Sequence, residues 1–315
     1  MKNYALYFLL LLTGLLSAGC QKDADLLDCE PPVVASALQT LATKHGVPTH
    51  KVNVPNNQYN VIRTPKGGVI AFNDNSFEFK DGQALPATAQ LEVRYREIYD
   101  KADMILSGTP TVSNGQPIES AGEFYIKAFS NGKELRQKKN KSIFINTPVR
   151  RGQTLPGMQI FFGTTAADGS FNWLLPSASD TQSRVWTSTA IDSAFYNLTV
   201  ANDTLGWINC DRFLNLSPLT KVEVTVAGAL PSNTLVYLVF RNRNAVMSAR
   251  FDPAAKTFTA SNMPEQEPLS VLVIQEANGK YYFARQEVTI TTNMRLAPSL
   301  QEVSEADLVA RIKGL

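Results

Sequence analysis

The chain has 315 residues, and 30 Lys and Arg side chains against 28 Asp and Glu give a formal net charge of +2 at pH 7. Such a balanced charge excludes the marked basic excess of nucleic-acid-binding proteins, so no nucleic-acid partner is expected. Hydrophobic residues make up 44% of the chain, which excludes a disordered polypeptide, and the length allows two folded domains.

Residues 1–19 are predicted to be a targeting segment and not part of the fold. Lys2 provides a short basic start, and an apolar run follows over residues 7–16, interrupted by Thr13 and Gly14. This run is shorter than the roughly 20 residues that a helix needs to span a bilayer. Its length is typical of the apolar region of a signal peptide, which is removed from the mature protein.

Small residues precede a cysteine at the end of this segment, in the sequence Leu16-Ser17-Ala18-Gly19-Cys20. The pattern resembles the lipobox of bacterial lipoproteins. The resemblance implies cleavage before Cys20 and its modification with lipid, including palmitate, so that the membrane becomes a partner. Two or more acyl chains hold a protein firmly at a bilayer. The alternative is an ordinary signal peptide in which Cys20 occurs by chance.

Residues 20–31 are expected to be a lipid tether. Its first part, Gln21-Lys22-Asp23-Ala24-Asp25, resembles the surface-export signal of Bacteroidota-type lipoproteins. That resemblance implies an outer membrane lipoprotein exposed at the cell surface, whereas the alternative is a polar spacer with incidental charges. Fully extended, the segment from Gln21 to Pro31 reaches roughly 35–40 Å, so the folded body is expected to stay near the membrane.

Residues 32–150 are predicted to form a short helix and then a β-sandwich. Within 32–45, apolar residues recur at helical spacing and Gly46 follows the last of them. After that, apolar and charged residues alternate with a period of two, which is typical of strands with one buried face. The alternating stretches are 77–80, 91–96 and 124–128, and turn signals follow at Asp81-Gly82 and Asn131-Gly132.

Residues 151–215 are expected to be an irregular middle segment that contains all three tryptophans. Residues 216–315 are predicted to form a second β domain. In it, residues 235–240 are apolar throughout, as in a strand buried on both faces, and Ser304 begins a C-terminal helix. The predicted fold class is therefore all-β, with two β-sandwich domains and short terminal helices.

The first β block resembles the ZU5 domain, and the second resembles a generic immunoglobulin-like sandwich. ZU5 domains are interaction and structural modules, so the first resemblance implies a protein that is not an enzyme. The second implies no activity by itself. The residues that carry the ZU5 resemblance are Gly67-Gly68-Val69-Ile70, Ser76-Phe77, Gly82, Leu91-Glu92-Val93, Thr111, Asn114-Gly115 and 120–124.

The sequence shows no recognisable catalytic constellation, so no enzymatic activity is expected. His45 and His50 are the only histidines, too few for a zinc site of three or four ligands or for an imidazole-based triad. They are interpreted as exposed loop residues, and no metal or cofactor is expected. A carboxylate-based polysaccharide hydrolase is the remaining enzymatic alternative. The acidic residues near the strand at 91–96 are interpreted as a solvated face; they are Glu92, Glu97, Asp100 and Asp103.

Two polar segments are candidate ion-binding sites. The turn Asn73-Asp74-Asn75-Ser76 offers oxygens that calcium could use, although Asn and Asp favour turns for local hydrogen bonding alone. A basic run after Asn131-Gly132 could contact an anionic polysaccharide, or it could protect a hairpin edge from aggregation. The run comprises Lys133, Arg136, Lys138, Lys139 and Lys141, with Arg150 and Arg151 nearby.

The remaining cysteines and the tryptophans each allow two interpretations. One interpretation is that Cys29 and Cys210 form a disulfide, because exported proteins enter an oxidising compartment. The other is that Cys210 is a buried free thiol beside Trp207. Trp173 and Trp186 either stack on the sugar rings of a ligand or belong to the core, as aromatic residues of sandwiches usually do. The sequence as a whole predicts a lipid-anchored cell-envelope protein with a structural or interaction role. The alternative is a surface component that binds glycans or envelope proteins.

Overall fold

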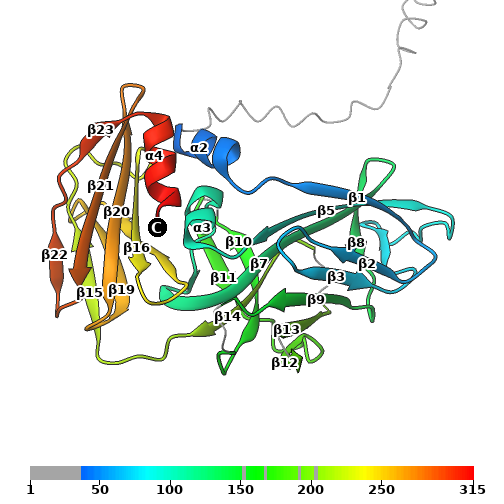
Figure 1. Ribbon diagram of the computed structural model, residues 1–315. Helices are drawn as coiled ribbons and strands as arrows, with labels where there is room; N and C mark the ends of the chain where they lie inside the picture. Colours follow the sequence, from blue (N-terminus) through cyan, green and yellow to red (C-terminus); the bar gives the residue numbers. More distant parts are fainter. Residues whose placement is uncertain (1–36, 151–153, 167–168, 191–192, 202–204) are drawn as a thin grey trace, which may run out of the picture. The chain divides into compact units, whose positions relative to one another are not determined.

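The computed structural model describes residues 37–315 apart from 151–153, 167–168, 191–192 and 202–204 (Figure 1). The expected signal peptide, Cys20, the tether with Cys29, residues 32–36 of the predicted helix and Arg151 lie outside the described residues. The described chain consists mainly of strands in antiparallel sheets, with short helices, so the all-β fold class is confirmed.

The larger sheet of the first sandwich is built around β7, a 15-residue strand from Gln116 to Ser130. β7 pairs antiparallel with β5 on one side and with β14 on the other. The sheet runs in the order β1-β5-β7-β14-β10-β11. Its other strands are β1 (His50–Pro55), β5 (Gln90–Ile98), β14 (Trp207–Phe213), β10 (Gln159–Thr165) and β11 (Phe171–Leu174), with the short strands β4 (Phe77–Phe79), β6 (Val112–Ser113) and β8 (Lys133–Gln137) attached.

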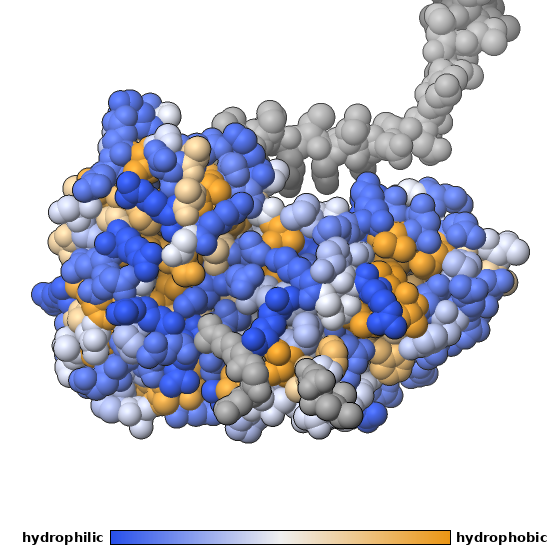
Figure 2. All heavy atoms as spheres, in the orientation of Figure 1, coloured by the Kyte–Doolittle hydropathy of each residue, from blue (hydrophilic) through white to orange (hydrophobic). Residues whose placement is uncertain are grey.

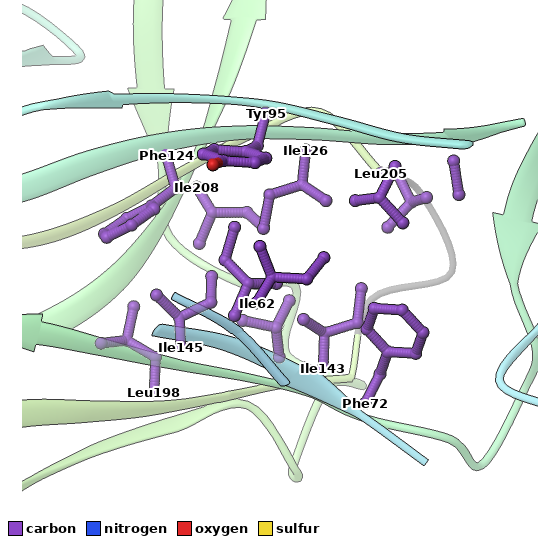
Figure 3. Packing of buried hydrophobic residues seen from close by; sticks show 14 of the residues in the cluster. Ile62, Phe72, Tyr95, Phe124, Ile126, Ile143, Ile145, Leu198, Leu205 and Ile208 are labelled. Carbon is purple, nitrogen blue, oxygen red and sulfur yellow. The ribbon is translucent and has the colours of Figure 1, made fainter. Parts of the chain in front are cut away.

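A second sheet packs against the larger one across a hydrophobic core (Figure 3). Its strands, in order, are β12 (Arg184–Ala190), β13 (Ser193–Val200), β9 (Ile143–Pro148), β3 (Val69–Phe72) and β2 (Asn60–Arg63). One register row places Ile62, Ile70, Ile145 and Leu198 side by side across four of these strands, all buried in the core. Because side chains alternate along a strand, the residues next to them point away from the core.

The middle segment 151–215, expected from the sequence to be irregular, contributes five strands among its described residues. β10, β11 and β14 extend the larger sheet, whereas β12 and β13 extend the second one. Apolar and polar residues alternate in β14 over only four residues, 208–211, so the signal is short, and both faces of the strand are covered. Ile208 and Cys210 lie in the core, and Asn209 and Asp211 on the opposite face are equally buried.

The second sandwich is formed by two further sheets around their own core. One contains β18 (Arg250–Asp252), β19 (Thr257–Pro264), β15 (Leu219–Val224) and β22 (Met294–Leu296), and the other contains β17 (Val246–Ser248), β16 (Thr234–Phe240), β20 (Pro268–Ala277), β21 (Lys280–Thr289) and β23 (Gln301–Val303). Nearly every residue of β16 is buried, which confirms the prediction of a strand covered on both faces.

Three helical segments cover the outer face of the β16–β20 pair (Figure 1). They are α2 (Ala37–His45), α3 (Lys101–Ser107) and α4 (Glu305–Lys313). Ser304 caps α4 by accepting a hydrogen bond from the backbone N–H of Asp307, as the sequence predicts. The sequence did not reveal α3, because its three consecutive buried residues, Met104 to Leu106, show no period, although Gly108 in the left-handed conformation marks its end.

Two Asn-Gly pairs close hairpins where the sequence places them. Asn131-Gly132 joins β7 to β8, and Asn278-Gly279 joins β20 to β21. All four residues have positive φ angles, which Asn and Gly tolerate best and which tight hairpin turns require.

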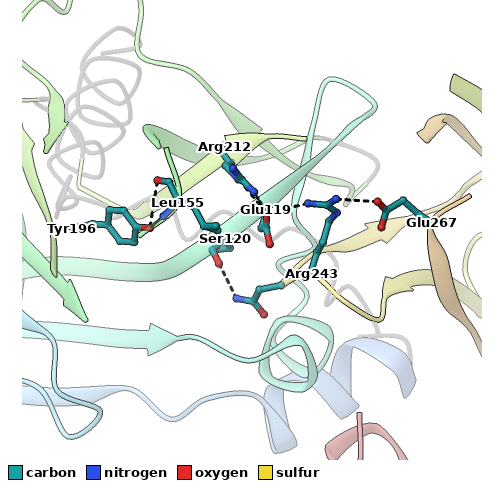
Figure 4. A network of polar contacts seen from close by, with 8 residues as sticks. Glu119, Ser120, Leu155, Tyr196, Arg212, Arg243 and Glu267 are labelled. Carbon is teal, nitrogen blue, oxygen red and sulfur yellow. Dashed lines mark hydrogen bonds and ion pairs between the residues drawn. The ribbon is translucent and has the colours of Figure 1, made fainter. Parts of the chain in front are cut away.

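A polar junction connects the two sandwiches (Figure 4). Glu119 of β7 accepts hydrogen bonds from Arg212 of β14 at 2.8 and 3.1 Å and lies 3.8 Å from Arg243. Arg243 in turn pairs with Glu267 of the second sandwich at 2.9 Å. The Asn244 side chain donates to the carbonyl oxygen of Ser120 at 2.9 Å. These partly buried bonds hold the N-terminal part of β7 against the loop after β16. The described residues belong to one compact unit.

Candidate functional site

The outer face of the sheet β12-β13-β9-β3-β2 is the candidate site, and we call it the outer platform. One register row crosses all five strands and contains Trp186, Asn197, Asn146, Val69 and Arg63. Neighbouring strands lie about 4.8 Å apart, so this row extends over roughly 19 Å. The other members of the outer platform are Arg184 and Ser188 of β12, Thr199 of β13, Phe144 of β9 and Val61 of β2.

The local sequence explains why these side chains face outward. In β2 the burial alternates, with Asn60 and Ile62 buried and Val61 49% exposed. In β9 the same alternation buries Ile145 and leaves Phe144 and Asn146 partly exposed. The large core side chains therefore fix the register, and a register slip by one residue would turn the core face outward.

Trp186 provides an exposed aromatic ring at one edge of the outer platform. It is 44% exposed, which is unusual for a tryptophan in a sandwich. The Arg184 guanidinium carbon lies 5.8 Å from the ring centroid. The Asn197 side chain donates to Ser188 Oγ at 2.9 Å and receives a hydrogen bond from the Asn146 amide. The ring thus lies beside an ordered row of amide and hydroxyl groups.

Trp173, the other tryptophan predicted to stack on a ligand, is in the core. Its side chain is fully buried and packs with Ile118 and Phe161, and its Nε1 donates to the carbonyl oxygen of Pro110 at 3.1 Å. The prediction of ligand stacking is wrong for Trp173, because its side chain faces the buried cluster with Ile118 and Phe161. Trp207 is partly buried and packs against the same cluster.

The two histidines are not the free loop residues expected from the sequence. His45 ends α2, and its Nε2 lies 2.6 Å from Oε1 of Glu305 in α4, where Lys44 also pairs at 2.7 Å. His50 lies in β1 and stacks on Tyr95, with ring centroids 5.3 Å apart. Both are structural contacts between elements distant in sequence, and the described residues contain no group of three or more His, Cys, Asp or Glu side chains that could hold a metal ion.

Glu97 is the clearest exception to the predicted solvated acidic face. It is 1% exposed and accepts hydrogen bonds from Thr64 Oγ1 at 2.5 Å, from the Lys66 backbone N–H at 2.6 Å and from the Tyr99 hydroxyl at 3.3 Å. The carboxylate thus anchors the β2–β3 turn to β5. Gly68 in that turn has no room for a side chain, since a Cβ would lie 2.8–3.2 Å from three of these groups.

The other acidic residues of this region are partly exposed. Glu92 pairs with Arg94 at 2.5 Å, and Asp103 pairs with Lys66 at 2.6 Å, so both are surface ion pairs of small energetic value. Asp100 is the N-terminal flanking residue of α3 and is exposed.

The turn at 73–76 is held by its own hydrogen bonds. Ser76 Oγ donates to the Asn73 carbonyl oxygen at 2.8 Å, and the Asn75 amide donates to Asp74 Oδ2 at 3.1 Å. Asn75 has a φ angle of 51°, which Asn tolerates better than most residues. These contacts agree with a structural turn.

Most side chains of the basic run make contacts with neighbouring groups of the protein. Arg136 pairs with Glu78 at 2.8 Å, Lys141 donates to the Asp74 carbonyl oxygen at 3.1 Å, and Lys133 lies 5.9 Å from the ring centroid of Phe79. Further along the chain, Arg150 lies over the Tyr99 ring at 4.1 Å. These partners favour the interpretation of a structured hairpin edge over a free cationic patch.

Cys210 is a buried free thiol in the core of the first sandwich. Burial raises the pKa of this thiol well above its ordinary value, and the adjacent Asp211 raises it further. The protonated thiol is therefore the stable form, and it is a poor nucleophile.

Two buried carboxyl groups lie on the face of the larger sheet that is turned away from this core. Glu123 and Asp211 are both fully buried, and burial raises the pKa of each well above its ordinary value. Glu123 accepts a hydrogen bond from Thr109 Oγ1 at 2.6 Å, and Asp211 accepts one from Asn209 at 2.6 Å. The other oxygen of each carboxyl has no hydrogen-bond partner. Both groups are thus buried polar groups of the scaffold, and neither lines the outer platform.

No protein-family model matches the chain, and no curated protein matches it in sequence. In the part of the chain that the structure describes, no helix is long and apolar enough to cross a membrane. The surface seen in Figure 2 is mainly hydrophilic, with separate apolar patches. The function is therefore inferred from the geometry of the site.

Proposed function

We propose that the protein is a lipid-anchored cell-envelope component that binds glycans on the outer platform. The observation that carries this proposal is the exposed ring of Trp186 on the same sheet face as the partly exposed Asn146 and the exposed Arg63, with the buried Asn197 holding the Asn146 amide in place. A sugar ring presents C–H groups on its faces and hydroxyl groups at its edge. The C–H groups can stack on an aromatic ring, and the hydroxyl groups can form hydrogen bonds with amide and guanidinium groups.

The remaining parts of the proposal come from the N-terminal sequence. The lipobox ending at Cys20 and the Gln21-Lys22-Asp23 start of the tether support anchoring in the outer membrane with display at the cell surface. An anchored binding module gains from this position, because the ligand is held close to the membrane. Labelling of cells with palmitate, comparing wild type with Cys20→Ala, tests the anchor; label that persists in Cys20→Ala contradicts it.

The binding proposal is tested with Trp186→Ala on a glycan array, followed by calorimetry on the best ligand. Loss of the stacking surface is expected to weaken binding about tenfold or more, as for other desolvated aromatic contacts. Leu230→Ala is the matched control, because Leu230 is also exposed, at 55%, but belongs to the second sandwich. Equal binding by wild type and Trp186→Ala, or no glycan ligand at all, contradicts the proposal.

A second candidate function is binding of a protein partner at the opposite edge of the same sheet. β2 ends the sheet among the described strands, and Tyr59 and Val61 are 56% and 49% exposed there. An extended segment could add to such an edge as a further strand. Tyr59→Lys, outside the outer platform, would disrupt this partner while leaving glycan binding at Trp186 intact, so the two candidate functions can be separated.

A further inference from the structure

A polar hollow of about 640 Å³ opens next to the outer platform. Its volume falls within the roughly 300–1,000 Å³ of typical small-molecule sites. One wall comes from β8 and the turn after it, with Arg136, Gln137, Lys139 and Asn140. The other wall comes from residues 177–182, which precede β12, and the remaining lining includes Phe162 and Ala201.

Two chain segments run from the hollow to the outer platform. Gln182 and Ala201 line the hollow, and Arg184 and Thr199, two residues further along each chain segment, form the first register pair of the outer platform. The Ala201 backbone N–H donates to Ser183 Oγ at 3.0 Å, which keeps the two segments together at this point. Trp186 lies four positions after Gln182, a distance of roughly 13 Å in an extended strand.

The charged groups of the lining balance one another. Arg136 donates from Nε to Glu78 at 2.9 Å and pairs with it through Nη2 at 2.8 Å. Asp180 accepts hydrogen bonds from the backbone N–H groups of Gln182 and Ser183 at 3.1 and 2.9 Å. Lys139 is exposed. Two cationic and two anionic side chains therefore face the same space.

A charged ligand would meet a group of its own sign in this hollow. An anion faces Glu78 and Asp180, and a cation faces Arg136 and Lys139. A hydroxyl-rich neutral molecule avoids both repulsions and can use fixed donors and acceptors from every wall. The amides of Gln137, Asn140 and Gln182 add further hydrogen-bonding groups to the lining.

We infer that the ligand of the outer platform is an uncharged polysaccharide, whose chain continues from Trp186 into this hollow as a second subsite. The inference rests on the proposed function. It adds the class of ligand and the direction in which the polysaccharide runs across the protein.

The first test uses chain length. Gln182→Trp places a bulky indole in part of the hollow but leaves Trp186 unchanged. Calorimetry with neutral oligosaccharides is expected to show binding of a hexasaccharide weakened about tenfold, the effect of losing two or three hydrogen bonds, and binding of a disaccharide unchanged. Trp186→Ala weakens both. If Trp186→Ala lowers the affinity but Gln182→Trp does not, the proposed function stands and the second subsite is refuted.

The second test uses charge. Lys139→Glu makes the lining net negative, and Lys133→Glu is the matched control in the same hairpin but outside the hollow lining. Affinity for the neutral hexasaccharide is expected to change less than twofold in either variant, and to be insensitive to salt between about 0.05 and about 0.5 M. Preferential binding of a uronic-acid or sulfated polysaccharide, lost in Lys139→Glu and at high salt, refutes the neutral class. Unchanged melting temperatures show that each variant is folded.

Discussion

Replacing Glu123 with Gln is expected to make the protein less sensitive to rising pH. Glu123 is fully buried in β7, where one carboxyl oxygen accepts a hydrogen bond from Thr109 and the other has no partner. Burial raises the pKa of this carboxyl well above 4.5, and the nearby charges of Asp211 and Asp103 raise it further, while the Thr109 hydrogen bond lowers it. The folded protein therefore holds a proton that the unfolded chain releases.

The sign of the effect follows from this difference in bound protons. Above pH 4.5 the unfolded chain loses the Glu123 proton but the folded protein keeps it, so the free energy of unfolding falls as the pH rises through the folded pKa. One such group contributes a slope of up to about 1.4 kcal/mol per pH unit within that window. An amide has nearly the same shape and cannot ionise, so Glu123→Gln removes this slope.

Glu119→Gln provides a matched control on the same strand. Glu119 is also buried, at 4% exposure, but it pairs with Arg212 at 2.8 Å and lies 3.8 Å from Arg243. Losing its charge leaves Arg212 without its partner. It should destabilise the protein by about 1–3 kcal/mol, less than a fully buried pair because both arginines are partly exposed.

The assay is urea unfolding of wild type and both variants between about pH 5 and about pH 8. Relative to wild type, Glu123→Gln is expected to gain stability with every step in pH, and Glu119→Gln to lose stability throughout. If Glu123→Gln instead destabilises the protein at the highest pH and follows the wild-type slope, Glu123 is ionised in the folded state and the reasoning is refuted.

Two further predictions concern buried groups of the first sandwich. Glu97→Ala is expected to destabilise the protein by about 3–5 kcal/mol in urea unfolding, because Thr64, Lys66 and Tyr99 lose their shared acceptor, whereas Glu97→Gln keeps one oxygen and costs about half as much; equal losses in the two variants would contradict this account. The Cys210 thiol is expected to react with a thiol reagent only after unfolding, since burial both shields it and raises its pKa; rapid reaction in the native protein would show that the core opens.

Several elements of the fold have a signal that is local in the sequence. Alternating residues located the strands around Phe77, Leu91 and Phe124, because one face of each strand carries the large apolar side chains. Asn131-Gly132 and Asn278-Gly279 located two hairpins, because the φ angles of such turns favour these residues. Ser304 located the last helix through its capping hydrogen bond. Each of these features depends on residues only a few positions apart.

The candidate site was only partly predictable. The sequence selected Trp173 and Trp186 on equal terms, since both lie in a polar, loop-rich stretch. The structure separates them, because the Trp173 side chain packs in a buried cluster with Ile118 and Phe161, whereas Trp186 lies exposed on the outer face of its sheet. No local pattern around either tryptophan indicates which of the two side chains is covered in the folded chain.

Contacts between distant segments determine which faces of the strands are covered by protein and which are open to solvent. Glu97 lies on the same side of β5 as Leu91, Val93 and Tyr95, and its charge is accommodated there only because the β2–β3 turn, distant in sequence, supplies hydrogen-bond donors. The polar row from Trp186 to Arg63 exists only because five strands from separate parts of the chain align in one register. Local sequence fixes which residues point to the same side of a strand, but whether that side meets protein or water depends on contacts between segments far apart in the chain.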